Sequence, residues 1–107
     1  MKFDIARYPY CIINLRTREE AEVFEKYLNS IGEPFRKNNP NAITQAWSSY
    51  GGSFGVNYSQ KSFGSCRYYR SRSRRILSYD MFDWSEYESI PDSDELDNFL
   101  KQYVISR

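Results

Sequence analysis

The alternation of hydrophobic and polar positions predicts a first strand over residues 8–15. Cys11, Ile13 and Leu15 fall on one face of an extended chain, and the opposite face also carries hydrophobic side chains. Because a strand that is hydrophobic on both faces must be covered on both sides, we expect it in the interior of a sheet. Pro9 stands at its start, where the missing backbone donor is tolerated.

The residues after this strand have the hydrophobic spacing of a helix. Thr17-Arg18-Glu19-Glu20 is a capping box, in which the Thr17 hydroxyl accepts from the Glu20 amide and the Glu20 carboxylate accepts from the Thr17 amide. Gly32 and Pro34 then favour the end of the helix near Ile31. One face of this helix is hydrophobic at i, i+3, i+4 and i+7, with Phe24, Tyr27, Leu28 and Ile31.

The middle of the chain predicts an antiparallel meander. After a polar loop over 35–41, we expect strands over 43–50, 54–58 and 65–71, with Gly51-Gly52 as a hairpin turn and a second turn over 59–64. In the third of these strands, Cys66 and Tyr68 are expected on one face, and Arg67 and Tyr69 on the other.

The last third predicts shorter elements. Ile76-Leu77 is expected as a fourth short strand, followed by a helical turn that docks Met81, Phe82 and Trp84 against the sheet, with a loop over 86–89. A second amphipathic helix is expected over about 93–105. The chain of 107 residues therefore predicts a single α+β domain over 1–107: an antiparallel sheet of about four strands, with the helix over about 17–31 across one face.

Composition removes several classes of function. The sequence contains no histidine, which excludes histidine-dependent nucleophiles and most transition-metal sites. No catalytic motif is recognisable, so we expect a protein that is not an enzyme and that has no cofactor. Cys11 and Cys66 are far apart and are expected as free thiols. The N-terminus lacks the features of a signal peptide, and no hydrophobic run would span a bilayer, so a soluble, cytoplasmic protein is expected.

The net charge of +1 conceals two opposed segments. Between Lys61 and Arg75 there are six basic residues and no acidic one, whereas Ile76–Leu100 holds eight acidic residues and no basic one. Arginine and tyrosine alternate in the basic run, a pattern found in single-stranded nucleic-acid platforms and equally typical of protein interfaces. The alternative is that the arginines pair with the acidic segment of the same chain. The candidate binding residues are Arg67, Tyr69, Arg70, Arg72, Arg74, Arg75, Trp47 and Tyr50.

Three other patterns have simpler explanations. Four acidic residues offer oxygen ligands for a divalent cation, but their spacing matches no calcium loop and favours a solvated acidic face: Asp80, Asp83, Glu86 and Glu88. Gly51–Gly55 lacks the ending of a phosphate-binding loop and favours a turn. A cross-strand aromatic cluster is expected from Trp47, Tyr50, Tyr58 and Tyr68.

The order of these motifs resembles small accessory proteins of tailed bacteriophages and prophages. The resemblance covers about residues 10–82 and depends on Thr17–Phe24 with Leu28 and Gly32, on Cys66–Tyr69 and on Ile76–Phe82. It implies a non-enzymatic protein that binds and inhibits or redirects a host or defence protein inside the bacterial cell. This is the leading functional hypothesis, and the alternative is a single-stranded RNA or DNA-binding domain that uses the basic-aromatic run.

Overall fold

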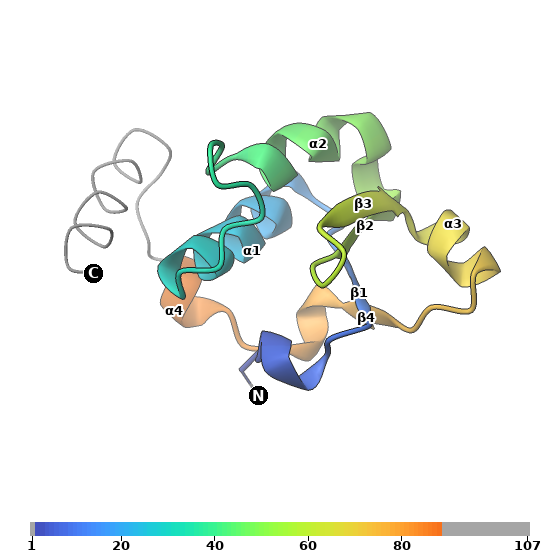
Figure 1. Cartoon of the computed structure of the whole chain (residues 1–107), viewed down its shortest axis with the longest axis horizontal. Coiled ribbons are helices and arrows are strands. Elements are labelled where there is room, and N and C mark those ends of the chain that lie inside the picture. Colours follow the sequence, from blue (N-terminus) through green and yellow to red (C-terminus); the bar gives the residue numbers. More distant parts are fainter. Residues whose placement is uncertain (1, 89–107) are drawn as a thin grey trace.

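A computed structural model describes residues 2–88 of the chain. The elements follow the order shown in Figure 1: 3-10 helix η1 (Ile5–Arg7), β1 (Ile12–Asn14), α1 (Arg18–Ser30), α2 (Ala42–Tyr50), η2 (Gly51–Ser53), β2 (Phe54–Asn57), β3 (Ser62–Ser65), α3 (Cys66–Ser71), β4 (Ile76–Ser78), η3 (Tyr79–Met81) and α4 (Ser85–Glu88). The helix predicted over about 93–105 lies outside the described residues.

The α+β class and a sheet of four strands are confirmed, although two of the predicted strands are helices and β3 falls where a turn was expected. The sheet has the order β3-β2-β1-β4, so β1 is an interior strand, as its two hydrophobic faces predict. Strands β1, β2 and β3 pair antiparallel, but β4 pairs with β1 in parallel, with Ile12 opposite Ile76. The sheet is therefore mixed rather than a purely antiparallel meander.

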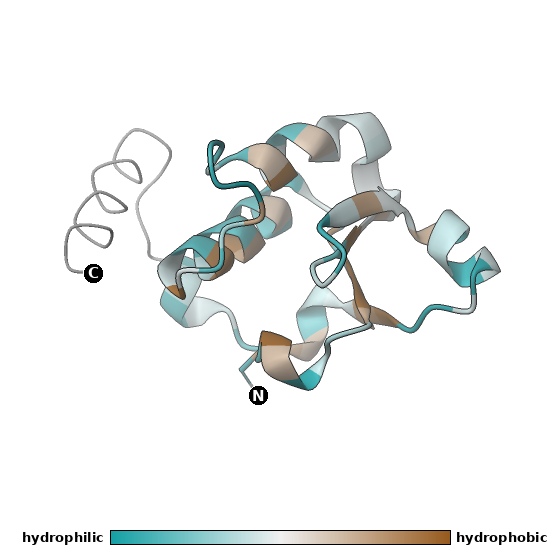
Figure 2. Cartoon of the chain, viewed as in Figure 1, coloured by the Kyte–Doolittle hydropathy of each residue, from teal (hydrophilic) through white to brown (hydrophobic). Residues whose placement is uncertain are grey.

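Helix α1 begins as its capping box predicts. The Thr17 hydroxyl accepts from the Glu20 amide at 3.1 Å. The Glu20 carboxylate, however, accepts from the amide of Arg16 at 2.9 Å and not from that of Thr17. The hydrophobic face of α1 packs into the core, and Figure 2 shows hydrophobic residues along α1, β1 and β4.

Residues 43–50 form a helix, and the predicted strand is wrong. Ile43, Ala46, Trp47 and Tyr50 follow the i, i+3, i+4, i+7 spacing of one helical face, and all four contribute to the core or pack against it. Gly51 ends the helix with φ of 58°, a conformation that glycine adopts without strain. Gly51-Gly52 is consequently not a hairpin turn but the start of η2.

The observed hairpin joins β2 to β3. All four residues of β2 are buried, because the strand pairs with both β1 and β3. The turn is shorter than predicted: residues 62–64 already belong to β3, and Lys61 takes a positive φ of 52°.

The segment after β4 docks as expected, with two differences. Phe82 and Trp84 are buried, and the Trp84 indole donates to the Tyr79 carbonyl at 2.8 Å. Met81, by contrast, is 49% exposed. The predicted loop is also wrong in its first part, since residues 86–88 belong to α4.

Candidate interaction surface on helix α3

The basic run forms a short helix, not the strand predicted over 65–71. Ser65 caps α3, since its hydroxyl accepts from the Tyr68 amide at 3.1 Å. Cys66 and Tyr69, three positions apart, lie on the buried face of this helix. Arg67, Tyr68 and Arg70 are therefore on the outer side.

Because this segment is a helix and not a strand, the buried and the exposed tyrosine are the reverse of those predicted. Tyr69, predicted on the outside, is 5% exposed and packs on the sheet beside Gly55 and Gly64, whereas Tyr68, predicted inside, is 51% exposed. Tyr68 is thus the binding candidate that the sequence interpretation missed. A helical reading of Ser65–Ser71, with its serine cap, would have found it.

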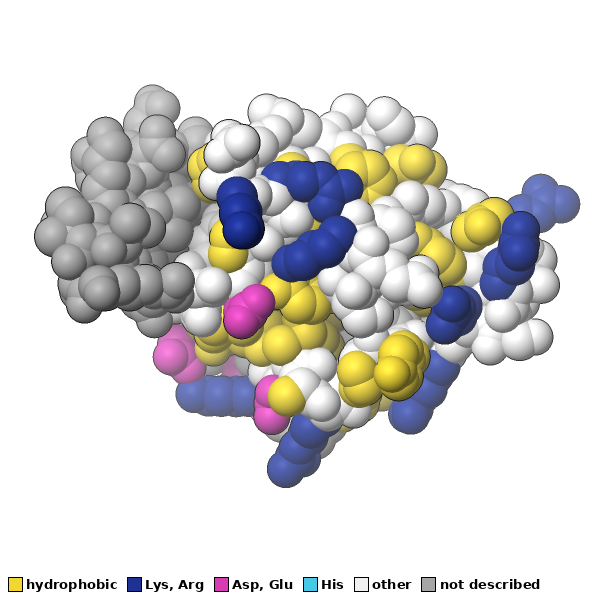
Figure 3. Space-filling model, viewed as in Figure 1, with side chains coloured by type: hydrophobic (Ala, Val, Ile, Leu, Met, Phe, Trp, Pro, Cys, Tyr) yellow, Lys and Arg dark blue, Asp and Glu magenta, His cyan; other side chains and the backbone are white. Residues whose placement is uncertain are grey.

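The arginines lie on α3 and on the loop before β4. The side chains of Arg67, Arg70, Arg72 and Arg75 are exposed, and that of Arg74 is half-buried. The Arg72 guanidinium carbon lies 5.3 Å from the centre of the Tyr68 ring, within the range of a cation–π interaction. Figure 3 shows Lys and Arg side chains without Asp or Glu between them at the end of the molecule that carries α3.

Within residues 2–88, no guanidinium group of these five arginines makes an ion pair or a hydrogen bond. The acidic residues of the adjoining segment have other partners there. Asp80 pairs with Arg16, and Glu86 pairs with Lys2. The self-pairing alternative therefore receives no support from the acidic residues up to Glu88, and those over 92–97 lie outside the described residues.

The other two candidates, Trp47 and Tyr50, lie on α2. Tyr50 is stacked on Phe54 with ring centres 5.3 Å apart, as part of the packing between α2 and the sheet. Trp47 is half-buried, and its indole Nε1 is enclosed without a hydrogen-bond partner in the described part of the chain. Neither belongs to α3, and because Tyr68 is exposed on α3, the four predicted aromatic residues do not form one cluster.

The two cysteines are free thiols, as expected. Cys66 is buried beneath α3, and burial raises the pKa of its thiol despite the nearby Arg70 guanidinium. This thiol is held in its neutral form and supports the packing of α3 rather than chemistry at the surface.

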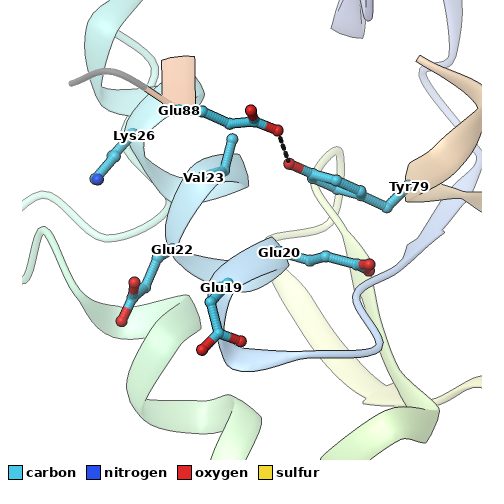
Figure 4. A pocket seen from close by; sticks show the side chains of 7 residues that line it. All are labelled: Glu19, Glu20, Glu22, Val23, Lys26, Tyr79 and Glu88. Carbon is cyan, nitrogen blue, oxygen red and sulfur yellow. Dashed lines mark hydrogen bonds between the residues drawn. The ribbon is translucent and has the colours of Figure 1, made fainter. Parts of the chain in front are cut away.

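An acidic groove of about 380 Å³ lies between α1, η3 and α4 (Figure 4). It is lined by Glu19, Glu20, Glu22, Val23, Lys26, Tyr79 and Glu88. Three of its four carboxylates already have partners: Glu20 and Glu22 pair with Arg16 and Arg18, and Glu88 accepts from the Tyr79 hydroxyl at 3.4 Å. Burial and the neighbouring carboxylates raise the pKa of Tyr79, so its hydroxyl stays protonated.

No group of histidine, cysteine and acidic side chains suited to a metal ion occurs between residues 2 and 88. The predicted acidic quartet is spread over separate contacts, with Asp83 accepting from Ser85. In the same part of the chain, no helix is long and hydrophobic enough to cross a membrane.

Comparisons of the chain with protein-family models, with curated proteins and with solved structures found no match. The geometry of the α3 surface is therefore the basis for assigning a function.

Proposed function

We propose that this chain is a non-enzymatic interaction protein that binds an acidic surface of a partner protein through α3 and the loop before β4. The observation that carries the proposal is the group of five arginines around exposed Tyr68, none of them paired with a carboxylate within residues 2–88. Arginine and tyrosine are the side chains that contribute most often to the energetic centres of protein interfaces. Unpaired guanidinium groups also speed the encounter with an acidic partner.

The geometry favours a protein over single-stranded nucleic acid. A nucleic-acid platform needs a row of exposed rings on which successive bases stack. The ring of Phe54 in the sheet and the ring of Tyr69 on α3 are buried instead, so that α3 offers a single exposed ring, Tyr68. Nucleic-acid binding remains the alternative outcome of the experiment below.

The resemblance to phage accessory proteins suggests the class of partner. Such proteins commonly bind and inhibit or redirect a host or defence protein, and an arginine-rich face suits an acidic patch on that protein. The proposed activity is occupation of that patch, with no chemical step.

Affinity purification from bacterial cells with mass spectrometry, with and without nuclease, tests the proposal. The variant with Arg70, Arg72 and Arg74 changed to Glu should lose the stoichiometric partner that the wild-type chain retains after nuclease treatment. The matched control changes three exposed cations outside α3 to Glu, which gives the same net charge: Arg7, Arg36 and Lys37.

Two results would contradict the proposal. Equal loss of the partner in both variants would show that only net charge matters. Recovery of nucleic acid without a stoichiometric protein would assign the surface to the alternative function.

A further inference from the structure

A second exposed tyrosine, Tyr10, lies near the arginines although it is about sixty positions earlier in the sequence. Tyr10 is 71% exposed, more than any other large hydrophobic or aromatic residue within 2–88. It occupies a turn two residues before β1. This large aromatic ring is exposed to solvent and does not contribute to the packing of the core.

The parallel pairing of β1 with β4 brings Tyr10 to the basic run. Ile12 lies opposite Ile76, and the Ile12 amide donates to the Arg75 carbonyl at 2.8 Å. Because parallel strands begin at the same edge of a sheet, the residues before β1 and the residues before β4 are neighbours. The backbone at Tyr10 is therefore close to the segment of Arg74 and Arg75.

Helix α3 completes this end of the molecule. It contacts all four strands. The Tyr68 ring lies beside Gly64 of β3, and the chain after α3 passes through Arg72 to Arg74 and Arg75, which lead into β4. Figure 3 shows hydrophobic and basic side chains next to one another between η1 and α3. A stretch of surface thus runs from Tyr68 by way of Arg72, Arg74 and Arg75 to Tyr10, with an exposed aromatic ring at each end.

A purely acidic ligand would use the guanidinium groups alone and would leave both rings in water. Burying a tyrosine ring requires hydrophobic surface on the partner, and the rim of charges around it then excludes water from the contact. The two kinds of side chain together fit a partner that offers carboxylates and hydrophobic groups within one short segment.

We propose, on the basis of the proposed function, that the partner contacts this surface through an acidic segment that also carries hydrophobic side chains. The hydrophobic side chains pack on Tyr10 and Tyr68, and the carboxylates pair with Arg72, Arg74 and Arg75. Tyr10 is a specificity-determining residue of this contact, because it favours the binding of acidic segments with hydrophobic residues over acidic segments without them.

Two synthetic peptides of equal length and charge test this assignment. Both are rich in Glu, and every third position is Leu in one and Ser in the other. In titration calorimetry, the wild-type chain should bind the Leu peptide about tenfold more tightly than the Ser peptide. Tyr10→Ala should remove most of that preference, whereas Tyr10→Phe, which keeps the ring, should retain it.

The control is Ile31→Ala, which removes an exposed hydrophobic side chain from the far end of α1 and should leave the preference unchanged. Equal affinity of the wild-type chain for both peptides would overturn this inference. If the Arg70→Glu, Arg72→Glu, Arg74→Glu variant still abolished binding in that case, the proposed function would stand. Binding of neither peptide, or tighter binding of an oligothymidylate of equal charge, would overturn both.

Discussion

Glu25 is a carboxylate on α1 that caps a different helix. Its oxygens accept from the amides of Ile43 and Thr44 at 2.9 and 3.0 Å and from the Thr44 hydroxyl at 3.0 Å. Asn41, at the usual capping position of α2, makes no such bond. Glu25 therefore replaces the local cap, and its negative charge meets the positive end of the α2 dipole.

The stability of the protein should fall as pH rises through the titration of Glu25. Burial raises the pKa of Glu25 to about 7 although its three hydrogen bonds oppose the shift. Between its ordinary pKa of 4.5 and this value the folded state binds more protons than the unfolded state. The free energy of unfolding is thus highest below pH 4.5 as far as Glu25 is concerned, and it decreases by about 3 kcal/mol up to pH 7.

Urea denaturation at several pH values from 4.5 to 8 measures this slope. Glu25→Gln should remove it, since an amide does not titrate. Glu22→Gln, on the outer side of the same helix, should leave the slope intact. A slope that persists in the Glu25 variant would assign the pH dependence to another group.

Gly55 allows α3 to approach the sheet. A Cβ atom at this position would lie 2.8 Å from Cγ2 of Ile12 and 3.1 Å from Cδ2 of Tyr69, closer than a side chain normally approaches either atom. Gly55→Ala should therefore lower the free energy of unfolding by about 1–3 kcal/mol. At Gly52 the nearest atom would be at 3.6 Å, so Gly52→Ala is the control and should be nearly neutral in thermal denaturation. Equal effects of the two substitutions would contradict the steric explanation.

At the scale of the elements, the N-terminus of α1 depends on local chemistry that the sequence states directly. Thr17→Ala removes the acceptor for the Glu20 amide and should destabilise the protein by about 1 kcal/mol. Thr17→Ser keeps the hydroxyl and should recover most of that loss, as measured by chemical denaturation. If serine fails to recover it, the methyl group of Thr17 rather than the cap supports the helix.

The prediction of α2 and α3 as strands has one cause. Both α2 and α3 are rich in aromatic residues, which favour strands, and both are short. Their helical period is present in the sequence, at Ile43, Ala46, Trp47 and Tyr50 and at Cys66 and Tyr69. A short segment satisfies a period of two almost as well as a period of 3.6, and the cap of α2 comes from another helix.

For the whole molecule, the separation of the basic and acidic segments has a consequence for stability. The arginines of α3 have no ionic partner within residues 2–88, so changing Arg70, Arg72 and Arg74 to Glu should alter the free energy of unfolding by no more than about 1 kcal/mol. The contrast is Arg16→Glu, a single reversal beside Glu20 and Asp80 that should lower the thermal midpoint. A strongly destabilised triple variant would instead support pairing of the arginines with acidic residues of the same chain.

The amino-acid sequence was sufficient to predict the features that depend on neighbours along the chain. The cap and hydrophobic face of α1, the interior position of β1, the strand at Ile76 and the absence of histidine chemistry all follow from residue types at fixed spacing. The segregation of charge is likewise a property of the sequence, and it identified the arginines of the candidate surface.

The residues that accompany those arginines are set by contacts between segments far apart in the sequence. The helical conformation of α3 buries Tyr69 and exposes Tyr68, because Ser65 caps the turn and Gly55 admits the buried ring. The parallel register of β1 and β4 adds Tyr10, whereas an antiparallel register would have placed the start of β1 beside the end of β4. Strand direction and register depend on contacts between distant segments, and a local pattern of hydrophobic positions carries no record of them.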